Sequence, residues 1–198
     1  AASPEDRRYL LFNPMTKMKV TTQGEEVVDL IWDAIAAKGF ERDQYFSQAA
    51  IDIRALPKLE GTVHVNIALL VKFMPNYFFN PGEFPDVPQQ SAAVNDDFLF
   101  EQGATRGLSG IQFHDYNEAF ALFDTPNVKL FRSKIEIFKG MLQDCPPTKE
   151  QSRDVDYLLA GGQIFALIVY GQLILENAKI YDLGEDLVDE MFDVFCRD

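Results

Sequence analysis

Apolar residues recur at the spacing of an α-helix in the first third of the chain. Over 24–38 they share one face, with Glu25 and Glu26 in the first turn and Gly39 after the last turn, as at many helix ends. A second helix is predicted over 44–54, because the residue before Pro57 is pushed out of the helical region. The first apolar face consists of Val27, Leu30, Ile31, Ala34 and Ile35.

A third helical pattern covers 61–78, where Pro75 should kink or end the helix. The stretch that follows, 79–97, is rich in proline, asparagine and serine, which predicts a long irregular connection. Short helices are expected at about 96–101 and 115–123.

The last third of the chain predicts three helices with recognisable starts. Thr125 precedes a proline, so we expect it to cap a helix that runs to about residue 143. Thr148 and Gln151 have the spacing of a capping box, which predicts that the next helix starts there and runs to about residue 181. Gly184 then separates it from a final helix that continues to the last residue.

No strand pattern competes with these helices, so the predicted fold is an all-α helical bundle with its helices packed up and down. We divide it into a first helical segment, 1–78, an irregular connection with short helices, 79–124, and a helical extension, 125–198. The chain begins without a clear element and ends inside a helical pattern. We therefore expect it to be a fragment of a longer polypeptide.

The stretch 157–175 contains no charged residue and is long enough to span a membrane. It also contains Gln163, Gln172 and three glycines, and charged helical sequence continues on both sides. An all-round apolar helix can also be the middle of a bundle. We favour the buried central helix and predict no membrane span.

Composition narrows the function classes. The 198 residues are 47% hydrophobic and carry a net charge of −13, which repels phosphate backbones, so we predict no nucleic-acid partner. Two cysteines without a CxxC motif indicate a reduced, cytoplasmic chain. Two distant histidines do not suggest a metal site, and the first residues lack a signal-peptide core.

The tripeptide Glu60-Gly61-Thr62 is the candidate for chemistry. Taken alone, it is an ordinary helix entrance with Thr62 as the N-cap and Glu60 in solvent. Alternatively, Glu60 is a base in an apolar pocket, because burial among Leu56, Leu59 and Val63 would strengthen a carboxylate as a base. Gly61 would let a ligand approach the backbone closely.

The context of this tripeptide resembles a known family. The turn Ala36-Ala37-Lys38-Gly39-Phe40, the pair Ile51-Asp52 and Glu60-Gly61-Thr62 follow one another at the spacing of corresponding motifs in the acyl-CoA dehydrogenases. The separation from Phe40 to Glu60 is similar to that of the medium-chain members. The resemblance covers about 21–74 and implies the C-terminal helical domain of these flavin-dependent oxidoreductases of fatty acid metabolism.

The resemblance implies specific roles. Glu60 would be the base that removes the α-proton of an acyl-CoA thioester, while the β-hydrogen passes as hydride to FAD. The backbone N–H of Glu60 would help bind the thioester carbonyl, with Gly61 beside the substrate. Gly61, Thr62 and Asn66 would lie near the flavin. The implied partners are an acyl-CoA, the remaining N-terminal and β domains, and further copies in a homo-oligomer.

Some positions depart from the family pattern. Ala36 and Ala37 replace two glycines, Asp33 replaces a glutamine, and Ile51 replaces an arginine. An acidic side chain at 33 would repel a flavin diphosphate. The alternative function is therefore a non-catalytic helical domain of the same fold that mediates oligomerisation or partner binding.

Overall fold

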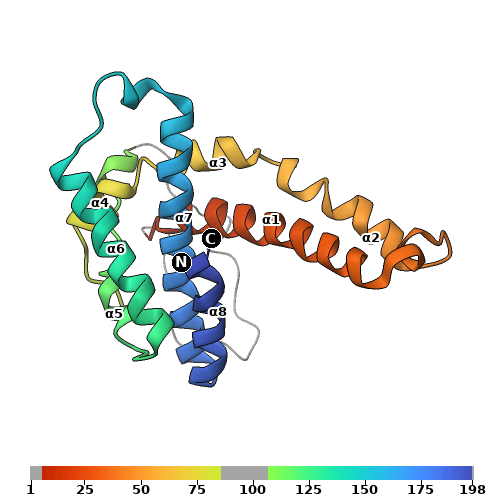
Figure 1. Cartoon of the computed structure of the whole chain (residues 1–198). Coiled ribbons are helices and arrows are strands. Elements are labelled where there is room, and N and C mark those ends of the chain that lie inside the picture. The colour runs from red at the N-terminus through yellow and green to blue at the C-terminus, as the bar shows by residue number, and fades with distance from the viewer. Residues whose placement is uncertain (1–5, 86–106, 198) are drawn as a thin grey trace.

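The computed structural model describes residues 6–85 and 107–197, and within these ranges it contains helices and no strand. The predicted all-α helical bundle is confirmed (Figure 1). The α-helices are α1 Tyr9–Ile35, α2 Tyr45–Ile53, α3 Val63–Leu70, α4 Met74–Phe79, α5 Tyr116–Phe120, α6 Pro126–Asp144, α7 Val155–Ile180 and α8 Glu185–Arg197. Single turns of 3-10 helix are η1 Ala36–Phe40, η2 Leu56–Lys58, η4 Leu108–Gly110 and η5 Gln151–Arg153. The helix expected at 96–101 lies outside the described residues.

Helix α7 stands at the centre of the bundle and packs against α1, α3, α5 and α8 (Figure 1). Its contact with α3 is very close, since a Cβ on Gly162 would lie 2.2 Å from Cγ2 of Ile67. Within the described residues, α7 is the one helix long and apolar enough to cross a membrane, and 44% of its apolar stretch is buried inside the bundle. The residues that α7 buries are Gly162, Phe165, Ala166, Ile168, Val169, Gly171, Gln172, Leu175 and Ala178.

Aromatic side chains fill the space around α7. Tyr77 stacks on Tyr116 with ring centroids 5.5 Å apart and meets Phe165 edge to face at 5.1 Å. Phe131 and Phe192 make a second edge-to-face pair at 5.3 Å, between α6 and α8. Offset and edge-to-face pairs of this kind add to the stabilisation that their burial supplies. One core thus joins elements from both ends of the chain.

The outer half of α1, together with η1 and α2, projects from the bundle as an arm (Figure 1). The core cluster contains Leu11, Met15 and Met18 of α1 and takes no further buried residue until Ile67. The apolar face that predicts the helix over 24–38 is exposed in this chain; Val27 is 51% exposed and Leu30 is 62% exposed. The arm therefore contributes little to the core of the described structure.

The start of α1 differs from its predicted start. The helix begins at Tyr9 rather than at residue 24 and carries Pro14 inside it. A proline in a helix removes one backbone hydrogen bond. Burial of Leu11 and Met15, both 0% exposed, offsets this loss because tertiary packing supplies most of the stability of helices in proteins.

The helix predicted over 61–78 is interrupted before Pro75 rather than at it. The structure divides it into α3 and α4, which are separated at 71–73. Pro75 lies in the first turn of α4. At that position the missing N–H has no intrahelical partner to lose, so the proline starts a helix instead of kinking one.

Two of the predicted helix starts are built differently. The capping box forms, with Gln151 N–H donating to Thr148 Oγ1 at 3.2 Å and Thr148 N–H donating to Gln151 Oε1 at 3.0 Å. It opens only the short turn η5, and Asp154 caps α7 by accepting from the backbone N–H groups of Asp156 and Tyr157. The capping box therefore starts the short 3-10 turn η5, which directly precedes α7.

Helix α6 begins at Pro126, but the Thr125 side chain does not cap it. The carboxylate of Asp189 on α8 accepts from the backbone N–H of Asn127 at 2.8 Å and from its side-chain amide at 3.0 Å. A capping group has thus come from another helix, which also ties α6 to α8. Local sequence contains no trace of this contact, because the two residues are 62 positions apart.

Candidate functional site

The turn between η2 and α3 carries the candidate base. Glu60 has φ +50° and Gly61 has φ +99°, so both residues lie in the left-handed region. Glycine adopts this region freely, whereas a residue with a side chain is disfavoured there. Thr62 follows as the predicted N-cap of α3, and its Oγ1 accepts from the backbone N–H of Val65 at 3.4 Å.

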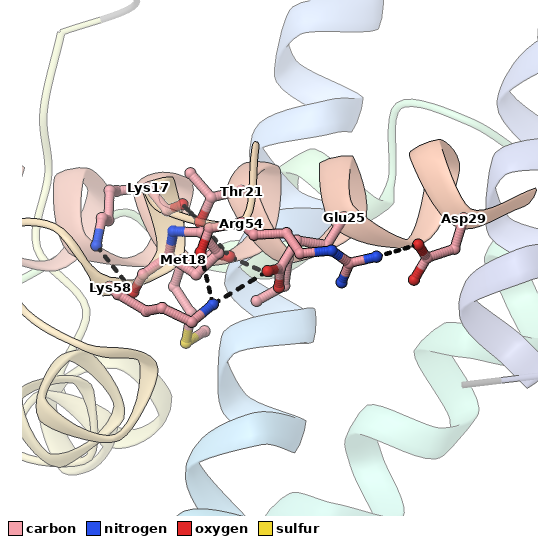
Figure 2. Close-up of polar contacts among 9 residues, drawn as sticks. Lys17, Met18, Thr21, Glu25, Asp29, Arg54 and Lys58 are labelled. Atoms are coloured by element: carbon pink, nitrogen blue, oxygen red, sulfur yellow. Dashed lines mark hydrogen bonds and ion pairs between the residues drawn. The ribbon is translucent and has the colours of Figure 1, made fainter. Parts of the chain in front are cut away.

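A lysine from α1 holds this turn. The ammonium of Lys17 donates to the backbone carbonyls of Leu59 at 2.5 Å, Gly61 at 2.6 Å and Pro57 at 3.3 Å. Figure 2 shows Lys17 reaching out from α1, beside the contacts that Arg54 and Lys58 make with the same helix. Lys17 could not be predicted from the sequence, because no local pattern connects it with carbonyls more than 40 residues away.

Asn66 braces the same turn from α3. Its side chain is buried, with 7% exposed, and its Nδ2 donates to the carbonyl of Gly61 at 3.4 Å. A Cβ on Gly61 would lie 3.2 Å from Asn66 Oδ1. The described contacts of Asn66 are therefore within the chain, and its role toward a cofactor stays a prediction.

The apolar pocket expected around Glu60 does not form from the described residues. Glu60 is exposed, as are Leu56 at 42% and Leu59 at 55%, and Val63 is half-buried. The reason is position: the turn joins η2 to α3 beside α1, and these neighbours leave the side chains of Leu56, Leu59 and Glu60 exposed. Any apolar cover over this carboxylate would have to come from outside the described structure.

Polar contacts tie α2 and η2 back to α1. Arg54 pairs with Asp29, and Lys58 pairs with Glu25 at 3.1 Å, as Figure 2 shows. Asp52 accepts from the side-chain amide of Gln48 on the same helix. Such exposed pairs contribute between zero and about 1 kcal/mol each, so they align the arm more than they stabilise it.

The arm tip contains the positions that match the glycine turn of the acyl-CoA dehydrogenases. Ala36 has φ +51° and ψ −130°, a conformation that suits glycine and strains alanine. Gly39 is required for packing, since a Cβ there would lie 2.6 Å from Nε1 of Trp32. The Trp32 ring lies against Phe40, with centroids 4.8 Å apart.

A shallow depression of about 680 Å³ lies at this tip, lined by Asp29, Trp32, Asp33, Ala36, Ala37 and Phe40. Its two charged lining residues are carboxylates; Asp29 pairs with Arg54, whereas Asp33 has no ion-pair partner within 6–85 and 107–197. A diphosphate would be repelled by Asp33. The residues present at the tip therefore do not fit the diphosphate of FAD.

A buried polar chain lies elsewhere, between α4 and α7. The Tyr77 hydroxyl donates to Gln172 Oε1 at 2.6 Å, and Gln172 Nε2 donates to Glu176 Oε1 at 2.7 Å. Burial raises the pKa of Glu176, against the hydrogen bond from Gln172 and the charges of His114 and Arg8, which lower it. These hydrogen bonds satisfy the buried Tyr77 hydroxyl and both ends of the Gln172 side-chain amide.

Metal chemistry has no candidate in the described part of the chain, where no cluster of histidine, cysteine and acidic residues could hold an ion. No protein-family model, no curated protein and no solved structure matches the chain. The resemblance to the acyl-CoA dehydrogenases therefore rests on the motifs at 36–40, 51–52 and 60–62 alone. What is established at this point is an all-α bundle with a projecting arm and a clamped turn at its base.

Proposed function

We propose that the chain is the helical C-terminal part of a flavin-dependent acyl-CoA dehydrogenase and that Glu60 is its catalytic base. The observation that carries the proposal is the conformation of Glu60. A non-glycine residue at φ +50° is disfavoured, and such residues gather at active sites, where the surrounding structure holds them in place. Glu60 is flanked on both sides by carbonyls that Lys17 anchors.

The chemistry requires two groups that this turn can supply. The α-proton of a thioester is weakly acidic, so a positioned carboxylate must take it while donors stabilise the developing enolate oxygen. Glu60 brings both groups, a carboxylate and its own backbone N–H. FAD, when bound, supplies the acceptor for the β-hydrogen.

Two features of the chain imply that other domains of the polypeptide would complete the site. Glu60 is exposed, so the acyl-CoA and the remaining domains would have to exclude water from it. The tip with Asp33 does not fit a diphosphate, so cofactor contacts would come mainly from those domains. The proposal therefore concerns a base carried by this chain within a composite site.

The test uses the full polypeptide. It should be yellow, and its flavin spectrum should bleach when an acyl-CoA is added. Glu60→Gln should keep flavin and acyl-CoA binding and lose bleaching by at least about 100-fold, because the amide cannot take a proton. Glu26→Gln, an exposed glutamate on α1, is the matched control and should bleach normally. A colourless protein, or normal bleaching by Glu60→Gln, would contradict the proposal.

A second candidate function is favoured by a separate observation. The arm exposes an apolar stripe on the face of α1 formed by Val20, Val27, Leu30, Ile31 and Ile35. Contiguous apolar surface of this kind marks an interaction site in a soluble protein. A helical domain that joins copies of the same chain would use this stripe without any chemistry at Glu60.

A further inference from the structure

Every N–H donor of the Lys17 ammonium has a backbone carbonyl acceptor in or beside the candidate turn. A lysine ammonium has three N–H donors, and here three backbone carbonyls accept from it, those of Pro57, Leu59 and Gly61. A carbonyl bonded to a charged donor is held more firmly than one bonded to a neutral donor. The ammonium therefore fixes this stretch of backbone at three points, within a turn of only a few residues.

Two of these carbonyls flank Glu60 directly. In a trans peptide the C=O and the following N–H point in opposite directions. Because the carbonyl of Leu59 points at Lys17, the backbone N–H of Glu60 points away from it. Among the described residues this N–H has no hydrogen-bond acceptor. We call the three hydrogen bonds from Lys17 to the carbonyls of Pro57, Leu59 and Gly61 the clamp. The clamp leaves the unpaired N–H of Glu60 beside the Glu60 carboxylate.

The clamp is anchored in the rigid part of α1. Lys17 lies between Met15 and Met18, which are 0% and 4% exposed and belong to the core cluster. The outer arm begins beyond this point. The turn is therefore held by the part of α1 that packs in the core of the bundle. A site is positioned most precisely when the element that holds it is itself packed in the core.

We infer that Lys17 is a positioning residue for the Glu60 turn, one that fixes the left-handed backbone and aims the Glu60 carboxylate and N–H outward together. The clamp stands on the hydrogen bonds of the described chain. Its catalytic consequence rests on the proposed function of Glu60. The two parts can be tested separately.

The clamp is tested in the 198-residue chain by amide hydrogen exchange. Lys17→Met keeps the side-chain stem and removes all three donors, so the amides of Leu59 and Asn66, which close hydrogen bonds on either side of the turn, should exchange at least about 10-fold faster. The amides of α7 should be unchanged, which shows that the variant folds. Lys17→Arg, which keeps the charge in a different geometry, should recover part of the protection.

Lys58→Met is the matched control, since Lys58 also joins this segment to α1, through Glu25. It should change the exchange of Leu59 and Asn66 by less than about threefold. The clamp is overturned if Lys17→Met leaves both amides as protected as in the wild type, or if Lys58→Met exposes them equally. Should Lys17→Met not fold, Lys17→Arg and Lys17→Gln carry the same comparison.

The positioning role is tested in the full polypeptide loaded with flavin. Lys17→Met should slow bleaching by acyl-CoA at least about 10-fold and change the dissociation constant of acyl-CoA less than about threefold, because a displaced base costs rate rather than binding. Lys17→Arg should recover part of the rate. Normal bleaching by Lys17→Met would overturn the role. A wild type that does not bleach contradicts the function of Glu60, while the exchange result still decides the clamp.

Discussion

At the scale of single residues, three described non-glycine positions have positive φ, namely Ala36, Glu60 and Asp182, and the first two are held differently. Glu60 is held by the ammonium of Lys17, whereas the contact recorded for the backbone of Ala36 is an N–H donated to the carbonyl of Trp32. Ala36 also occupies the position where the acyl-CoA dehydrogenase pattern has a glycine. Alanine therefore stands here in a backbone conformation that suits glycine.

Ala36→Gly should therefore stabilise the arm. Relief of the strain at φ +51° is expected to contribute about 1 kcal/mol, more than the added freedom of glycine in the unfolded chain removes. Urea unfolding followed by tryptophan fluorescence measures it. Ala37→Gly, the neighbouring position without a left-handed φ, is the control and should destabilise the arm. A lower midpoint for Ala36→Gly would show that the alanine is unstrained.

Glu176 makes stability depend on pH. Burial raises its pKa, so the folded state holds this proton more tightly than the unfolded state does. The stabilisation of the folded state by protonated Glu176 is therefore fully present below the carboxyl pKa of the unfolded chain, about 4.3. This stabilisation is lost as pH rises through the pKa of Glu176 in the folded state. Gln172 donates a hydrogen bond to Glu176, and the charges of His114, Arg8 and Glu118 also act on its pKa.

Glu176→Gln keeps an acceptor for Gln172 and removes the charge. Relative to the wild type, it should raise Tm by about 2 °C at pH 7 and give no gain near pH 3.5, where both proteins are neutral at this site. Circular dichroism at the two pH values measures the difference. Glu190→Gln, an exposed glutamate on α8, should show no such pattern. An equal gain at both pH values would argue against a buried charge as the cause.

At the scale of elements, the arm and the bundle differ in how they are held. The bundle shares one aromatic and aliphatic core around α7, whereas the arm depends on Trp32 with its ring neighbours and on exposed ion pairs. Regions with few buried apolar contacts open at lower free energy than the core. The arm should therefore unfold before the bundle.

Trp32 is the one tryptophan of the chain, so its fluorescence reports the arm alone. In urea, the fluorescence transition should fall about 1 M or more below the transition seen by far-ultraviolet circular dichroism, which is dominated by the other helices. Gly39→Ala should lower the fluorescence midpoint further and leave the second transition in place, because its Cβ would strike the Trp32 ring. Coincident transitions would mean that arm and bundle unfold as one unit.

Elements whose signals are local could be predicted from the sequence. The bounds of α2, α6 and α8 and the end of α7 agree within a residue or two with apolar periodicity and turn residues, and Thr62 caps α3 as expected. Features that depend on distant partners could not be predicted. The Tyr9 start of α1 requires a core contributed by later helices, and the Asp189 cap and the Lys17 clamp join residues more than 40 positions apart. For the candidate site, sequence therefore identified the turn but not what holds it.

At the scale of the whole molecule, the stripe of apolar residues on α1 is exposed to solvent, and covering it would be favourable. Homo-oligomerisation, expected from the family resemblance, offers one cover, in which the stripe pairs with the same stripe of a second copy. A two-fold contact of this kind uses one self-complementary patch on both copies. The high negative charge of the chain opposes association, so the contact would depend on its apolar residues.

The weight-average sedimentation coefficient of the 198-residue chain should therefore rise as the protein concentration is raised from about 1 to 100 µM. A modest interface has a dissociation constant in this range. Leu30→Lys should abolish the rise, because it places a charge in the middle of the stripe. Ile137→Lys is the matched control, since Ile137 is 73% exposed on α6, away from the arm. A wild type that stays monomeric, or equal loss in both variants, would exclude pairing through the stripe.

The clamp also has a topological consequence. The chain leaves the bundle after Met18 and returns to it at Gly61, so the two ends of the arm meet within the reach of the Lys17 side chain. Residues 19–60 thus form a closed excursion with its own small packing centre at Trp32. Such an excursion behaves as a module: lengthening, shortening or exchanging it leaves the path of the remaining chain intact. Evolution can reshape the arm and its stripe while the turn that carries Glu60 stays where it is.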